Sequence, residues 1–139
     1  MKSSYKPDDV TILLKDITGI IEPLDSSIRE RLIQSGTHYC EMLPKEYPPS
    51  PEYLATYKDA LSRFSEITAK AVGNAADKIY KSKNKAPVIV SLARAGTPVG
   101  ILIKRYLEKK YSITVPHYTI SIIRGREKKK NAMNFILSK

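Results

Sequence analysis

Residues 87–100 constrain the fold of this chain more strongly than any other stretch. The β-branched run at 88–90 is typical of a strand buried in a parallel sheet. A glycine-containing loop follows at 91–98, and apolar side chains then recur at helical spacing over 99–110. A second strand is predicted at 117–123. Strand, helix and strand over about 35 residues predict a parallel, right-handed βαβ unit and therefore an α/β fold.

The residues before this unit are mainly helical by pattern. The spacing of a serine and a glutamate at 27–30 is that of a capping box, which predicts a helix that ends near Gly36. A Ser-Pro pair at 50–51 predicts the start of a longer helix that runs to about Tyr80. The apolar positions that recur along this helix are Leu54, Tyr57, Leu61, Phe64, Ile67, Ala71 and Ala75.

The fold class that we predict is α/β, with a helical N-terminal part joined to the start of a parallel sheet. Residues 1–85 form the mainly helical portion of a single domain, and residues 86–139 form its βαβ portion. The apolar run at 10–14 fits either a strand or a buried helical turn, and a last short helix is predicted at 131–137. Two parallel strands cannot cover both faces of a core, so we expect the core of this chain to be incomplete.

The composition is that of a globular protein. With 139 residues, of which 42% are hydrophobic, the chain is long enough for one domain and too apolar for wholesale disorder. It contains no apolar run of the ~20 residues that a membrane-spanning helix needs, and its first residues lack the apolar stretch of a signal peptide. The single Cys40 fits a reducing compartment. We therefore expect a cytoplasmic protein without a membrane partner.

The net charge of +10 is concentrated in the C-terminal part. Residues 1–79 hold 10 Lys/Arg and 12 Asp/Glu, whereas residues 80–139 hold 14 Lys/Arg and 2 Asp/Glu. Such a basic field attracts phosphates, pyrophosphate or a nucleic-acid backbone. Because no helix-turn-helix, zinc finger or aromatic-interleaved basic strand is recognisable, a nucleic-acid-binding module is an alternative and not the main interpretation.

The loop between the first strand and its helix has features of an anion site. Ligands of open parallel sheets bind beyond the carboxyl ends of the strands, where the next helix presents free N–H groups. Gly96 permits a close approach, Thr97 can cap the helix, and Arg94 offers a planar fork that matches phosphate oxygens. The same residues also fit a tight strand-to-helix turn with one incidental arginine. The loop is not a P-loop, since it lacks the Gly-Lys-Ser/Thr sequence.

Several stretches together resemble a known family, the phosphoribosyltransferase-like proteins of bacterial tellurite-resistance and stress operons, part of which is named the StiP cysteine protease family. The loop also resembles the pyrophosphate loop of type I phosphoribosyltransferases, in which an Arg-Ala-Gly or Arg-Gly-Gly turn follows the first core strand. The stretches that carry the family resemblance are 5–14, 30–36, 38–43, 91–100 and 116–124.

The resemblance implies that the parallel sheet is of the phosphoribosyltransferase type. It also implies a protein that binds phosphoribosyl pyrophosphate, or a related phosphorylated ribose or nucleotide-like molecule, in a stress or tellurite-resistance pathway. Mg²⁺ would enter only together with the pyrophosphate. The complete protein would be a transferase acting at the ribosyl C1, for which no general base is assigned. The implied binding residues are Ser91, Arg94, Ala95, Gly96 and Thr97 in the loop, with Arg124 and Arg126 in a clamp that closes over it.

A second signature of phosphoribosyltransferases is missing from residues 1–139. In that family two acidic residues end a later strand, and a Thr/Gly-rich loop then binds the ribose 5-phosphate. We therefore expect this chain alone to lack transferase activity. Its partner would be either a missing C-terminal half or further copies of the same chain.

Cys40 supports a different function, that of a cysteine peptidase. Such an enzyme needs a thiolate paired with an imidazole, and the chain has two histidines, His38 and His117. Positions 38 and 40 share a face if the chain is extended and diverge by about 200° if it is helical. The plainer interpretation is a small buried cysteine without chemistry. Two histidines and one cysteine at these spacings match no zinc pattern, so no metal site is predicted.

Overall fold

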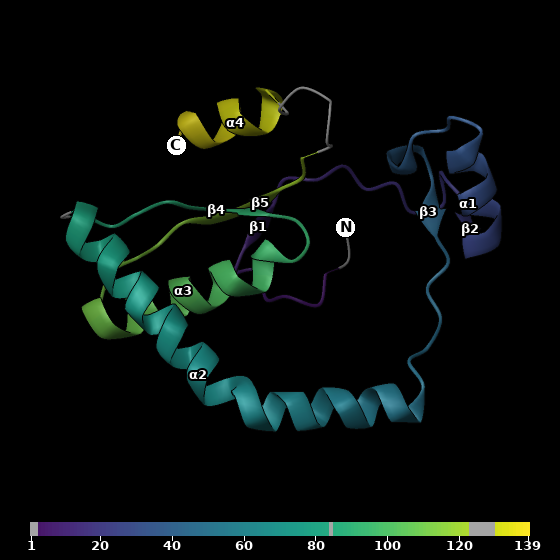
Figure 1. Cartoon of the computed structure of the whole chain (residues 1–139). Coiled ribbons are helices and arrows are strands. Elements are labelled where there is room, and N and C mark those ends of the chain that lie inside the picture. Colours follow the sequence, from purple (N-terminus) through teal and green to yellow (C-terminus); the bar gives the residue numbers. More distant parts are fainter. Residues whose placement is uncertain (1–2, 84, 123–129) are drawn as a thin grey trace. The chain divides into compact units, whose positions relative to one another are not determined.

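The computed structural model describes residues 3–83, 85–122 and 130–139. These residues form a mixed α/β protein with four α-helices and two small parallel sheets (Figure 1). The chain divides into two compact units, each of which we describe by itself. Residues 1–14 and 62–139 make up the sheet unit, and residues 15–61 make up the small unit. The α/β class predicted from the sequence is confirmed at this level.

The sheet unit is built on three parallel strands in the order β1-β5-β4. These strands are β1 (Thr11–Ile12), β4 (Ile89–Leu92) and β5 (His117–Ile120). Helix α3 (Gly96–Tyr111) connects β4 to β5, so the parallel βαβ unit read from the sequence is present. The run at 10–14, which fitted either a strand or a helical turn, contributes the short strand β1.

Helices lie on both faces of this sheet. On one face, α3 packs together with the C-terminal part of α2 (Pro51–Lys83), and fully buried Ala76, Leu107 and Val115 form the centre of the core. On the other face lies α4 (Lys130–Leu137), whose Phe135 contacts Tyr118 of β5 edge to face at 6.1 Å (Figure 1). Neighbouring side chains of a strand point to opposite faces, so Tyr118 faces α4 while its neighbours in β5 face α3.

A buried polar network connects the strands to α3. His117 is 3% exposed, and its Nε2 and Nδ1 lie 2.8 Å from Ser91 Oγ and 2.9 Å from the Asp9 carbonyl oxygen. Because a carbonyl only accepts, Nδ1 carries the proton, and Ser91 therefore donates to Nε2. Gly100 of α3 lies directly against this pair. Arg105 of α3 also binds the segment before β1, because its guanidinium forms a two-pronged ion pair with the Asp9 carboxylate at 2.6 and 2.7 Å.

The small unit contains strand β2 (Pro23–Leu24), helix α1 (Ser26–Gln34), the short 3-10 helix η1 (Tyr39–Glu41) and strand β3 (Leu43–Pro44). Strands β2 and β3 pair in parallel. Helix α1 ends as predicted near Gly36, whose φ of 100° requires a residue without a side chain. Tyr47 donates a hydrogen bond to Asp25 at the start of α1, which holds the pKa of that carboxyl below its usual value.

Two details of the helix starts differ from the sequence prediction. Asp25, and not Ser27, occupies the N-cap of α1, and its side chain makes no capping hydrogen bond, so the predicted capping box is wrong. In α3 the helix begins at Gly96, and the Thr97 hydroxyl lies 2.7 Å from Thr119 Oγ1 instead of capping the helix. The predicted cap of α2 is confirmed, since Ser50 Oγ accepts the Tyr53 N–H at 3.2 Å.

Burial is the property that the sequence pattern predicted least well. The apolar stripe along the first half of α2 is exposed, with Tyr57, Leu61 and Phe64 between 54% and 58% accessible. The strand expected to be buried on both sides is the edge strand β4, and Val90 within it and Val88 just before it are exposed. Apolar periodicity indicates which residues share a face, but not what covers that face.

Replacing Gly100 with alanine should destabilise the sheet unit. The new Cβ would lie 2.5 Å from His117 Nε2 and 2.8 Å from its Cε1, and the ring is held by two hydrogen bonds. We expect the free energy of unfolding in urea to fall by about 1–3 kcal/mol. Gly96→Ala is the matched control, because its nearest neighbour would be Ser91 Cβ at 3.8 Å. Equal stability of the two variants would contradict this packing.

Stability should also decrease as the pH falls below about 6.5. Burial, assisted by the nearby charge of Lys104, lowers the pKa of His117, while the contacts with Asp9 oppose this change. Protonation of His117 therefore favours the unfolded chain. The stabilisation that neutral His117 provides is complete above the pKa of this histidine in the unfolded chain, and it is lost as the pH falls through its lower pKa in the folded chain. Thermal unfolding between pH 8 and 5 should show this slope, and His117→Gln should flatten it. An unchanged slope in that variant would assign the effect to other groups.

Candidate active site

Cys40 and His38 lie in direct contact in the small unit. The His38 Nδ1 is 2.9 Å from the Cys40 Sγ, and both side chains are half-buried. The ring of His38 also stacks in a tilted arrangement on Tyr39, with the centroids 4.5 Å apart. Contact between a thiol and an imidazole is the arrangement that a cysteine nucleophile requires.

The local backbone creates this contact. His38 has extended backbone angles and is the N-cap of η1, so its ring folds back over the first turn. There Nδ1 also accepts the Cys40 N–H at 3.4 Å. Because a backbone N–H can only donate, Nδ1 is the unprotonated nitrogen, and the thiol S–H is the proton that points at it across the shorter contact. Met42, the C-cap of η1, is buried.

The second histidine is engaged elsewhere. Both ring nitrogens of His117 have partners in the sheet unit, Ser91 on one side and the Asp9 carbonyl on the other. Of the two histidines considered as partners for Cys40, the structure brings His38 to the thiol. The sequence left this open, because it allowed either an extended segment or a helix at 38–40, whereas the structure combines an extended residue with a 3-10 turn.

The loop residues singled out from the sequence occupy two environments. The hydroxyls of Ser91 and Thr97 are buried and bonded to His117 and Thr119, inside the sheet unit. Arg94 is exposed on the turn between β4 and α3. The remaining predicted binding residues are Ala95, which is exposed at the N-cap of α3, Gly96, which is its first residue, and Arg124 and Arg126, which lie outside the described residues.

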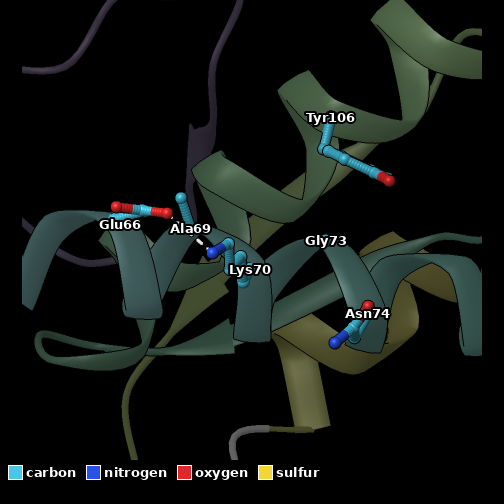
Figure 2. Close-up of a pocket in the computed structure, with 6 residues that line it drawn as sticks. All are labelled: Glu66, Ala69, Lys70, Gly73, Asn74 and Tyr106. Carbon is cyan, nitrogen blue, oxygen red and sulfur yellow. Dashed lines mark hydrogen bonds and ion pairs between the residues drawn. The ribbon is translucent and has the colours of Figure 1, made fainter.

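An open cleft of about 540 Å³ is lined by residues of α2 and by Tyr106 of α3 (Figure 2). Figure 2 shows its six lining residues, Glu66, Ala69, Lys70, Gly73, Asn74 and Tyr106. Glu66 and Lys70 form an ion pair at 2.6 Å across one helical turn. Gly73 lets α3 approach, since a Cβ there would lie 3.0 Å from the Tyr106 ring. The cleft contains neither a thiol nor an imidazole and is therefore a weaker candidate than the Cys40 pair.

Metal-ligand clusters and membrane-spanning helices are both absent from the described part of the chain. Within residues 3–83, 85–122 and 130–139, no three His, Cys, Asp or Glu side chains gather as metal ligands. None of the helices described there is both long and apolar enough to cross a membrane.

Comparison with known proteins identifies the family. Residues 3–139 match the family described as "Tellurite-like stress resistance cysteine protease StiP", and the chain therefore belongs to the StiP family. One relative is the cysteine protease StiP of Acinetobacter baylyi, which is 38% identical over 124 residues. The matched residues are 88% of this chain but 32% of the relative, so the chain spans about a third of the relative's length. No solved structure matches the chain.

These findings correct the main interpretation of the sequence. Both the family description and the relative's name specify a cysteine protease, so a transferase that binds phosphoribosyl pyrophosphate is the wrong function. The phosphoribosyltransferase type of fold is not confirmed either. In the structure, the features that suggested it have an internal explanation, because Ser91 and Thr97 serve the packing of α3 on the sheet. The StiP and stress-resistance parts of the resemblance are confirmed.

If His38 accepts the thiol proton, its removal should slow the alkylation of Cys40. Cys40 is the single cysteine of the chain, so one added mass reports the reaction with iodoacetamide. At pH 6.5 we expect His38→Gln to react about fivefold or more slowly than the unmodified chain, because less thiolate forms. At pH 9 the difference should shrink, because the more abundant hydroxide can take the thiol proton in place of His38.

The matched control for this experiment is His117→Gln, which removes the other histidine. Provided that circular dichroism shows the variant to be folded, its alkylation rate should equal that of the unmodified chain at both pH values. Equal rates for the unmodified chain and His38→Gln at pH 6.5 would mean that the contact does not activate the thiol.

Proposed function

We propose that this chain carries the nucleophile of a StiP-family thiol peptidase, with Cys40 as the nucleophile and His38 as its base. The observation that carries the proposal is the 2.9 Å contact between Cys40 Sγ and His38 Nδ1. It is supported by the family description and by the name of the Acinetobacter baylyi relative. A reducing cytoplasm, which the sequence also led us to expect, would keep this single thiol reduced.

The chemistry would follow the usual two stages of acyl transfer. The Cys40 thiol gives its proton to His38 Nδ1 as the sulfur attacks the carbonyl carbon of a peptide bond. The C–N bond then breaks, the imidazolium gives the proton to the departing amine, and an acyl-thioester remains on Cys40. Water, losing a proton to His38, attacks the thioester and releases the carboxylic acid and the thiol.

Further groups must complete such a site. The oxyanion that forms during attack needs hydrogen-bond donors, and the substrate needs a surface that orients it. We propose that the part of a StiP-family protein outside the region matched by this chain supplies some of these donors and some of this surface. The proposed activity therefore belongs to the assembled protein. The link to tellurite-like stress is that of the family description, and we extend it to this chain on the same basis.

The test uses a chimaera in which this chain replaces the matched part of the Acinetobacter baylyi relative. We expect the chimaera to hydrolyse fluorescently labelled denatured casein. Cys40→Ala and His38→Gln should each lower the rate by about 100-fold or more, because the two side chains act as one unit. His117→Gln serves as the control that removes an imidazole elsewhere. Undiminished hydrolysis by Cys40→Ala, or none by a folded chimaera, would contradict the proposal.

A further inference from the structure

Strand β4 leaves one edge of the sheet open. Within the described residues, β5 lies on one side of β4 and no strand pairs with the other side. The Ile89 N–H donates to the Pro116 carbonyl just before β5 at 2.9 Å, and the Ala93 N–H donates to the Ile120 carbonyl of β5 at 2.7 Å. In a parallel ladder alternate residues bond to the same neighbour, so the N–H and C=O groups of Val90 and Leu92 point to the open edge.

The same edge carries an apolar face. Val88, Val90 and Leu92 are 53%, 41% and 49% exposed, whereas Ser91 between them is buried against α3. Since side chains alternate along a strand, these three project from one face of the sheet. Native edge strands are commonly protected by a charge, a proline or a bulge, and residues 88–92 contain none of these. An exposed edge of this kind is suited to receive another strand.

We propose that the open edge of β4 pairs with a strand from the part of a StiP-family polypeptide that this chain does not match. The occupant is an apolar strand whose backbone bonds to Val90 and Leu92 and whose side chains cover Val88, Val90 and Leu92. The length of the relative supports this choice, because the matched residues make up 32% of it and the rest is available to extend the sheet. The proposal does not depend on the chemistry of Cys40.

Charge argues against a second copy of this chain as the occupant. Residues 80–139, which include β4, hold 14 Lys/Arg against 2 Asp/Glu. Two copies joined at this edge would bring two strongly basic segments together, and their repulsion would oppose the association.

The test compares hydrogen exchange in two proteins, this chain alone and the chimaera with the Acinetobacter baylyi relative. We expect the amides of Val90 and Leu92 to exchange at least about 100-fold more slowly in the chimaera, because each gains a hydrogen-bond partner inside a covered sheet. Ile89, which already bonds to Pro116, provides the internal reference. Unchanged exchange at Val90 and Leu92 in the chimaera would overturn the proposal.

A pair of matched variants tests the apolar face. Leu92→Lys places a charge at the edge, and Leu102→Lys places the same charge on α3, where the leucine is 46% exposed. In this chain alone the two variants should unfold at similar temperatures, whereas in the chimaera Leu92→Lys should unfold at the lower temperature by several degrees. Equal unfolding temperatures in the chimaera would overturn the proposal. Protection of Val90 and Leu92 that rises with the concentration of this chain alone would assign the edge to a second copy instead.

Discussion

The imidazole of His117 holds together parts of the chain that are far apart in the sequence. Its two hydrogen bonds join β5 to Ser91 on β4 and to Asp9 before β1, and Gly100 brings the first turns of α3 against the ring. A neutral ring with one donor and one acceptor nitrogen satisfies both partners, whereas a protonated ring would leave Ser91 without its acceptor. The three strands and α3 therefore depend on one buried, uncharged histidine.

This polar centre lies beside a small apolar one. Among the described residues, Ala76, Leu107 and Val115 form the fully buried apolar cluster, and the edge strand β4 remains exposed on one face. The sheet of three short strands that the described residues form buries little apolar surface. The strand that we propose to pair with β4 would add apolar contacts at this exposed edge.

The sequence predicted local features better than their surroundings. The βαβ unit, the Ser50 cap of α2 and the stop at Gly36 depend on neighbouring residues and were recovered. The role of Thr97 was not, because its partner Thr119 lies on a strand 22 positions away. The function predicted from the sequence was wrong for a related reason. A strand, a glycine turn and a helix start occur wherever a helix follows a parallel strand and packs on the sheet. The motif therefore does not by itself identify a phosphate ligand.

The Cys40 pair is an exception to this dependence on distant residues. Its two side chains are two positions apart, and a single 3-10 turn with His38 at the N-cap suffices to bring sulfur and nitrogen together. A dyad formed within one turn can have its geometry before any long-range packing is complete, which costs less chain entropy than joining remote elements. The groups that orient a substrate and stabilise an oxyanion do not have this advantage. The proposed dyad therefore needs only a short segment, whereas the proposed activity also calls for groups outside that segment.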